Sequence, residues 1–123
     1  MMRKCLFVML SLLTSLNYSS FTQASDEHGR YWIYGVGRQV CQTYLDARHN
    51  GGYSEISYKN WISGYLTSAN RSSDDTYNLL GRRDFQGAMV WLDRYCKKQP
   101  NNTIYMAMDN LVAVMMPDRR RSK

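Results

Sequence analysis

The feature that most constrains the fold is the stretch from Asp84 to Pro100, which carries a complete set of helix signals. Its apolar residues recur at helical spacing, so they share one face and need a partner to bury it against: Phe85, Ala88, Met89, Leu92 and Cys96. Asp84 is placed to cap the first turn, and Pro100 prevents the helix from continuing. The stretch therefore predicts an amphipathic helix with a cysteine on or beside its buried face.

Residues 1–24 have the three-part plan of a secretory signal peptide. A basic start is followed by an apolar run, Leu6–Leu16, and then by a polar segment that ends in the small residues Thr22 and Ala24. The apolar run is about half of the ~20 residues that a helix needs to cross a bilayer. We therefore expect cleavage after Ala24, which removes Cys5, and a soluble periplasmic protein without stable membrane insertion.

The two cysteines of the mature chain, Cys41 and Cys96, predict one intramolecular disulfide, because exported proteins fold in an oxidising compartment. Closing so long a loop stabilises a protein by roughly 4 kcal/mol in the chain-entropy model. The 99 residues that remain after cleavage suffice for one domain with a modest core. We assign residues 25–118 to that single helical domain and residues 119–123 to a basic C-terminal tail.

The net charge of +6 is concentrated outside the predicted domain. Arg3 and Lys4 leave with the signal peptide, and residues 119–123 supply the remaining +4. The domain itself is formally neutral, so it lacks the basic surface that predicts a nucleic-acid partner. Two interpretations of the tail stay open: contact with an anionic surface such as lipid head groups, or a solvated terminus, which is the more frequent case.

Hydrophobic periodicity along the chain predicts an all-α protein, a compact bundle. Four longer helices and one short helix are expected, over residues 37–48, 57–70, 76–80, 84–99 and 102–116. Ser57 is placed to cap the second helix, and the last helix is expected to begin at Asn102 or Thr103. Gly64, inside the second helix, would let another helix approach closely. The aromatic segment Tyr31–Gly37 is too aromatic to stay in water, so we expect it to cross the core as an extended or irregular strap, with a short strand as the alternative.

The sequence offers no set of residues typical of catalysis or of metal binding. His28 and His49 are spaced neither with each other nor with the cysteines as metal ligands are. A carboxylate pair for glycan hydrolysis would have to come chiefly from Asp74, Asp75 and Asp84. Helix capping explains these three residues more simply, so we expect no enzyme activity, no cofactor and no metal site.

Aromatic residues outside the helical stripes are the strongest candidates for a partner site, because tyrosine gives an interface large contact area at little entropic cost. The aromatic candidates are Tyr31, Tyr34, Tyr53 and Tyr77. The polar candidates near Tyr77 are Asn70, Arg82 and Arg83. The junction 70–83 is the best candidate for a binding loop, because it combines a basic pair with Tyr77. Core packing is the default interpretation for the other tyrosines.

Two segments resemble known protein families. Residues 61–70, Trp-Ile-Ser-Gly-Tyr-Leu-Thr-Ser-Ala-Asn, resemble the aromatic-x-x-Gly-Tyr helix of small exported proteins in the immunity families that neutralise type VI secretion effectors. Residues 91–100, Trp-Leu-Asp-Arg-Tyr-Cys-Lys-Lys-Gln-Pro, with Ala107, Leu111 and Val112 after them, resemble the ending of those proteins. One cysteine in the first helix and one in a late helix is similar to the acid-stress periplasmic chaperones of the HdeA type. A further resemblance is to exported proteobacterial proteins that carry Gly-Tyr, Asp-Thr-Tyr, Leu-Gly and Trp-Leu-x-x-Tyr-Cys.

These resemblances imply a non-enzymatic periplasmic binding protein whose partner is another protein. An immunity protein would neutralise a secreted effector. The alternative, an acid-stress chaperone, would hold unfolded clients at low pH. A homodimer stays open in both cases.

Overall fold

The computed structural model describes residues 25–123, so the predicted signal peptide lies outside the described residues. The chain forms two units, residues 1–31 and residues 32–123. In the described part of the first unit, residues 26–30 form a closed turn. The Asp26 carboxylate accepts hydrogen bonds from the backbone N–H groups of His28 and Arg30, and it pairs with the Arg30 guanidinium at 2.9 Å.

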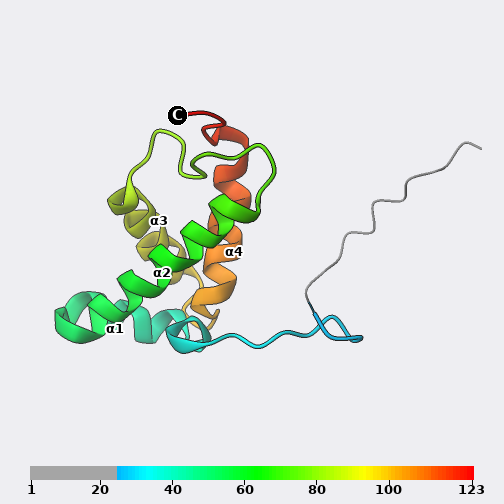
Figure 1. The fold of residues 1–123 in the computed structure, drawn as a ribbon. Coiled ribbons are helices and arrows are strands. Elements are labelled where there is room, and N and C mark those ends of the chain that lie inside the picture. The colour runs from blue at the N-terminus through cyan, green and yellow to red at the C-terminus, as the bar shows by residue number, and fades with distance from the viewer. Residues whose placement is uncertain (1–24) are drawn as a thin grey trace, which may run out of the picture. The chain divides into compact units, whose positions relative to one another are not determined.

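Residues 32–123 form an all-α unit with four α-helices (Figure 1). Its elements are the 3-10 helix η1 (Gly35–Arg38), α1 (Cys41–Asn50), α2 (Gly52–Ser72), α3 (Phe85–Lys98), α4 (Ile104–Met115) and the 3-10 helix η2 (Met116–Asp118). In residues 25–123 no strand forms, although two isolated bridges occur, Val40 with Thr103 and Asn78 with Arg120. The predicted all-α class with four longer helices is confirmed. None of the helices in these residues combines the length and the apolar character that crossing a bilayer would need.

Side-chain caps fix where α3 and α4 begin. The Asp84 carboxylate accepts a hydrogen bond from the backbone N–H of Gly87 at 2.8 Å, and the Thr103 hydroxyl accepts one from Met106 at 3.2 Å. Pro117 lies in η2, directly after α4. Both helices begin where the sequence predicts, because the cap residue and the apolar stripe are neighbours in the chain.

Helix α2 begins at Gly52, earlier than the predicted start at Ser57. Gly51 and Gly52 both have positive φ, +68° and +69°, and they complete the reversal between α1 and α2 without further residues. The Ser57 hydroxyl donates to the carbonyl of Tyr53 at 3.0 Å inside the helix and so caps nothing. Helix α1 begins at Cys41, later than expected, because η1 precedes it.

The predicted disulfide joins Cys41, the first residue of α1, to Cys96 near the end of α3, with 4.9 Å between the Cα atoms. Both cysteines are fully buried in one hydrophobic core. The largest fully buried side chains of this core are Tyr44, Ile62, Leu79, Met89, Leu92, Ile104, Met108, Leu111 and Met115. Each aliphatic side chain of this kind contributes about 1.5–3 kcal/mol when it leaves water. The core therefore lies where the apolar faces of all four helices meet, and the loop adds Leu79 to it.

The segment 73–84 is a loop, and the short helix predicted over residues 76–80 does not form. The backbone N–H groups of Tyr77 and Asn78 donate to the carbonyl of Arg120 at 2.8 and 3.0 Å, and the N–H of Arg120 donates to Asn78 at 2.9 Å. These bonds satisfy backbone groups that a helical turn would otherwise use. The C-terminal tail thus pairs with the loop.

Gly81 allows the close approach of the loop to the chain end. Its φ is +63°, and a Cβ at this position would lie 2.3 Å from the carbonyl oxygen of Asp118. On the other side of the loop, the Asn70 side chain accepts a hydrogen bond from the N–H of Leu79 at 2.7 Å. The loop is therefore held at both sides, by α2 and by the tail.

The aromatic strap packs through its backbone, and its rings point outward. Gly37 lies so close to the indole of Trp61 on α2 that a Cβ there would come within 2.1 Å of a ring carbon. The side chains of Trp32 and Tyr34 are 67% and 77% exposed. The expectation that apolarity buries this segment is wrong for Trp32, because the glycine backbone occupies the space against Trp61. The exposed ring of Tyr34 is accessible, as a candidate for partner contact needs to be.

Candidate functional site

The residues predicted to bind a partner do not form one site. Tyr53 is 85% exposed in the first turn of α2, whereas Asn70 lies near the end of this helix, about 25 Å away along its axis. Tyr34 lies beside the middle of α2, where its carbonyl accepts a hydrogen bond from Trp61. Tyr31 belongs to the first unit, whose position relative to residues 32–123 is not determined.

Within the predicted binding loop 70–83, two candidates have different surroundings. The side chain of Asn70 faces the loop and holds its backbone. Tyr77 is 46% exposed, and the guanidinium of Arg120 lies over its ring, 5.2 Å from the centroid. Tyr77 is therefore accessible to a partner, whereas the side chain of Asn70 stabilises the loop conformation.

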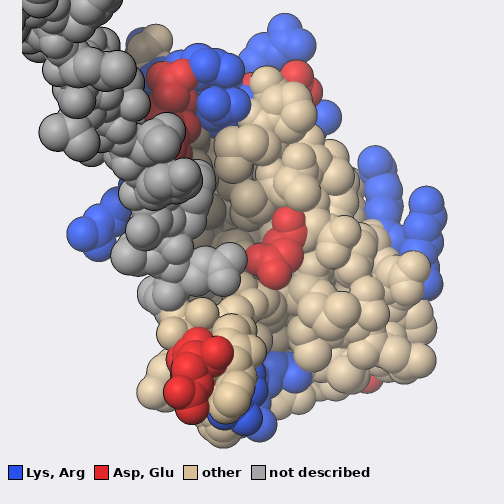
Figure 2. All heavy atoms as spheres, turned by 90° about the vertical axis from the view of Figure 1, so that its right-hand side faces the viewer, with Lys and Arg blue, Asp and Glu red and all other residues tan. Residues whose placement is uncertain are grey.

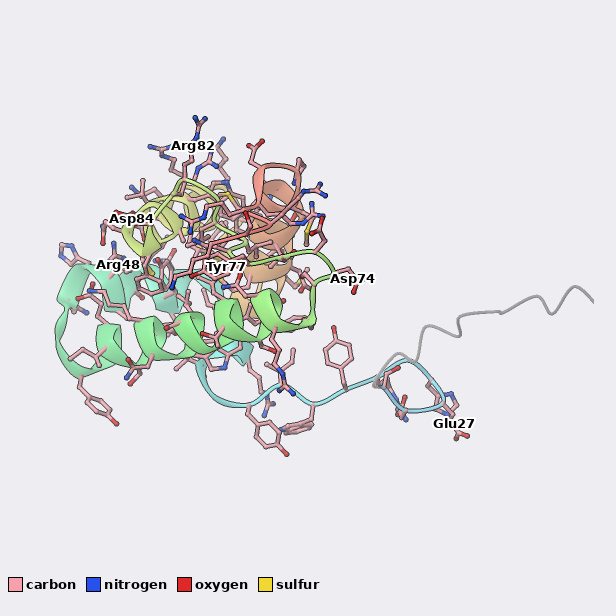
Figure 3. The ribbon with its side chains drawn as sticks, turned by 45° about the horizontal axis from the view of Figure 1, so that its top comes forward. Glu27, Arg48, Asp74, Tyr77, Arg82 and Asp84 are labelled. Carbon is pink, nitrogen blue, oxygen red and sulfur yellow. A yellow bond between two sulfur atoms is a disulfide. The ribbon has the colours of Figure 1, made fainter. Side chains whose placement is uncertain are left out.

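Arg82 and Arg83 are exposed at the end of the same loop. Together with Asp118 they line a hollow of about 530 Å³. Figure 3 shows Arg82 extending away from the helices, and Asp74 at the outer bend of the loop. The predicted basic pair is thus open to solvent and lies close to the chain end.

Aromatic residues of three segments, which we call the aromatic track, follow one another from the strap over α2 to α4. Its members are Trp32, Tyr34, Trp61, Tyr65 and Tyr105. The indole N–H of Trp61 donates to the carbonyl of Tyr34 at 2.8 Å, which fixes the strap on the helix. The ring centroids of Trp61 and Tyr65 are 5.5 Å apart, and those of Tyr65 and Tyr105 are 5.8 Å apart in an edge-to-face arrangement. The Arg38 guanidinium lies 4.6 Å from the centroid of the Trp32 ring.

Between α2 and α4 the aromatic track borders a groove of about 310 Å³ that has no charged lining residue. The groove is lined by Tyr65, Ser68, Ala69, Ser72, Ser73, Tyr105 and Val112. Figure 2 shows that most of the face that includes α4 carries neither basic nor acidic side chains. Aromatic enrichment and charge depletion are typical of the core of protein–protein interfaces. This surface is therefore the best candidate for a partner site.

One carboxylate fixes the middle of the track. The hydroxyl of Tyr65 donates to Oδ1 of Asp109 at 2.5 Å. Burial and this hydrogen bond raise the pKa of Tyr65 well above its ordinary value, so the hydroxyl stays protonated at neutral pH. The orientation of this ring is therefore set before any partner arrives, which lowers the entropic cost of binding.

Arg48 on α1 connects three helices in a polar network. Its guanidinium donates one hydrogen bond of 3.0 Å to each carboxylate oxygen of Asp93 on α3, and it pairs with Glu55 on α2. The hydroxyl of Tyr44 donates to Asp93 at 2.7 Å, and Lys59 pairs with Glu55 at 2.8 Å. Together with the disulfide, this network holds α1, α2 and α3 in a fixed arrangement.

The environment of the network keeps its carboxylates ionised. Burial alone would raise the pKa of Asp93, but hydrogen bonds from Arg48 and Tyr44 outweigh it and hold the pKa below its ordinary value. A hydrogen bond from Lys59 and another from Arg48 lower the pKa of Glu55. Both acids are therefore charged at neutral pH, where the network is complete.

The helical spacing of Trp61 and Tyr65 within residues 57–70 predicts that both are core residues, and no sequence signal singles out Tyr105. The structure leaves all three half-buried, with one edge in the track. The available signal was the pair Gly35 and Gly37, since two close glycines suit the approach of a backbone to a large ring. Nothing in the sequence indicates which ring that is.

No group of three His, Cys, Asp or Glu side chains within residues 25–123 is placed to hold a metal ion. The chain matches no protein-family model, and no curated protein and no solved structure gives a significant match to it. The fold and its surface define a small, disulfide-linked helical protein with an exposed aromatic face.

Proposed function

We propose that this chain is a non-enzymatic binding protein of the periplasm that covers a site on a protein partner with its aromatic track. The observation that supports this proposal is the exposure of Trp32 and Tyr34 on a backbone that Trp61 fixes. Large rings on a rigid backbone lose little conformational entropy when a partner covers them, so they contribute strongly to affinity.

A secreted effector is the partner class that the resemblance to immunity proteins implies. The resembling segment 61–70 contains Trp61 and Tyr65, which are members of the aromatic track. A protein that neutralises an incoming enzyme benefits from a surface that needs no rearrangement, because preorganisation strengthens binding. The disulfide and the Arg48 network supply such rigidity here.

Capture of a partner with matched variants tests the proposal. The mature protein, immobilised, should recover one stoichiometric partner from periplasmic extracts of the producing cell or of its competitors. W32A/Y34A should weaken that binding by roughly 100-fold, because central aromatic residues dominate interface energies. Y53A removes a ring that is at least as exposed but lies outside the track, and it should bind as the wild type does.

Three results would contradict the proposal: no partner, equal binding by W32A/Y34A, or equal losses in W32A/Y34A and Y53A. A captured effector should also lose its activity when one equivalent of this protein is added. Export is checked separately, because the periplasmic form should begin at Ser25. Sedimentation of both variants shows whether the track instead joins two copies of this chain.

An acid-stress chaperone is the second candidate, and one observation favours it. The contact of α1 with α3 includes an ion pair that depends on ionised Asp93. Protonation of this carboxylate would release Arg48 and loosen the helices, while the disulfide would keep them tethered. The protein should then suppress the aggregation of an acid-denatured client at about pH 2–3, and failure to do so would remove this candidate.

A further inference from the structure

The positive charge of the described chain is concentrated at one end of the helical unit. Residues 70–84 and 118–123 carry seven Lys and Arg against four Asp, whereas the rest of residues 25–123 carry seven against six acids. The basic residues of this end, which we call the arginine end, are Arg71, Arg82, Arg83, Arg119, Arg120, Arg121 and Lys123. Figure 2 shows basic side chains along the upper edge of the molecule, where the loop and the chain end lie in Figure 1, and others at its sides and lower edge.

The arginine end belongs to the folded surface. Arg120 pairs with Asn78 through backbone hydrogen bonds in both directions, and its guanidinium covers Tyr77. Gly81 brings the loop backbone against the carbonyl of Asp118. The tail arginines and the loop arginines therefore share one ordered surface, where their charges add.

The acids of this end only partly offset the basic residues. Asp84 caps α3, and Asp75 pairs with Arg121 at 2.5 Å. Arg82 and Arg83 form no side-chain hydrogen bond or ion pair with any described residue, although Asp118 borders the same hollow. Two guanidinium groups are therefore available for an external anion, and each can bind phosphate oxygens in a bidentate manner.

Apolar and aromatic groups are exposed among these charges. Tyr77 is in part exposed beneath Arg120, and Val114 is exposed in the last turn of α4, which η2 separates from the basic tail. Amphipathic rings of this kind settle at the head-group level of a bilayer, and nearby arginines add attraction to anionic lipids. This mixture favours a lipid surface over an acidic protein, which charge alone would also attract.

We propose that the arginine end docks on the anionic head groups of a phospholipid bilayer and holds the protein at a membrane surface without insertion. The proposal does not depend on the partner of the aromatic track. The protein would therefore act next to a membrane, with a separate surface for its partner.

Co-sedimentation of the mature protein with lipid vesicles tests the proposal. Vesicles of phosphatidylcholine mixed with phosphatidylglycerol should bind the protein, whereas pure phosphatidylcholine should not. R82Q/R83Q should lower the partition coefficient roughly 30-fold, since each basic residue near such a surface contributes a factor of about five. Added NaCl should weaken the binding of the wild type, because these charges are exposed.

K97Q/K98Q is the matched control, because it removes the same charge at the opposite end of α3. These lysines are about 20 Å from Arg83 along the helix, beyond the screening length of about 10 Å, so the control should change binding less than about threefold. Circular dichroism verifies that both variants fold.

Several outcomes would overturn the proposal. Equal losses in both variants would show a response to net charge alone, and equal binding to both lipid compositions would show that head-group charge is irrelevant. If the protein did not bind the phosphatidylglycerol vesicles at low salt, the proposal would also be overturned. If polyglutamate bound through Arg82 and Arg83 more tightly than the vesicles do, the occupant would be an acidic protein.

Discussion

Arg48 and Asp93 are 45 residues apart in the sequence, yet two parallel hydrogen bonds of 3.0 Å join their side chains. The same two helices, α1 and α3, are joined by the disulfide between Cys41 and Cys96. An ionic link and a covalent link therefore fix one helix pair. The ionic link responds to pH and the covalent link to reduction, so their contributions to stability can be measured separately.

Asp93→Asn should lower the free energy of unfolding by about 2 kcal/mol, because it removes the charge and turns an NH₂ group toward the Arg48 guanidinium. The loss is smaller than for a fully buried pair, since both side chains retain some contact with water. Urea unfolding followed by tryptophan fluorescence measures it. The control is Asp46→Asn, an exposed carboxylate on α1, which should change stability by no more than about 0.5 kcal/mol. Equal effects of the two substitutions would contradict a special role for the pair.

Stability should fall in acid. The folded-state pKa values of Asp93 and Glu55 lie below their ordinary values, so at low pH the unfolded chain binds protons before the folded chain does. The free energy of unfolding is therefore at its plateau above the ordinary carboxyl pKa, and it decreases as the pH falls from about 4 through the lowered folded-state values. Urea titrations at a series of pH values should show this decline, with a shallower slope in Asp93→Asn. An identical slope in the variant would exclude Asp93 as a source.

Local signals in the sequence were sufficient for the helices and the disulfide. Asp84 and Thr103 are caps that lie next to the stripes they start, and Cys41 and Cys96 had no other partners once the leader was assigned. Helix ends were less accurate where a glycine pair shortened the turn, as at Gly52. Each of these features depends on residues that are close in the chain or on a choice among few partners.

The features that the sequence did not predict depend on contacts between distant segments. The loop around Tyr77 is not helical because Arg120 supplies its backbone partners, and no local pattern reports that pairing. The strap leaves Tyr34 exposed because two glycines take the space against Trp61. The aromatic track could not be predicted for the same reason, since three separate segments compose it.

Loss of the disulfide should cost roughly 4 kcal/mol, mainly because the unfolded chain regains the freedom of a long loop. C41A/C96A removes the bond and leaves small side chains in the core. Reduced wild-type protein keeps both sulfur atoms and so serves as the comparison, and it should unfold at a urea concentration similar to that of the variant. If reduction left the midpoint unchanged, the bond would contribute nothing beyond packing.

Substitution by alanine should change the free energy of unfolding in opposite directions at Gly64 and Gly37. At Gly64, on the exposed side of α2, a Cβ would meet no atom within 4 Å, although the sequence suggested a close helix neighbour there. Gly64→Ala should therefore raise the free energy of unfolding by up to about 1 kcal/mol, the difference in helix propensity. At Gly37 a Cβ would overlap the Trp61 indole, so Gly37→Ala should lower it by about 2 kcal/mol and displace the strap. Urea unfolding compares the two variants, and the tryptophan fluorescence maximum in the background W32F/W91F, where Trp61 alone emits, reports the strap. A decrease in the free energy of unfolding of Gly64→Ala would contradict the prediction, because it would show that the outer side of α2 is not open. If the variant is more stable but captures less partner, that face of α2 contacts the partner.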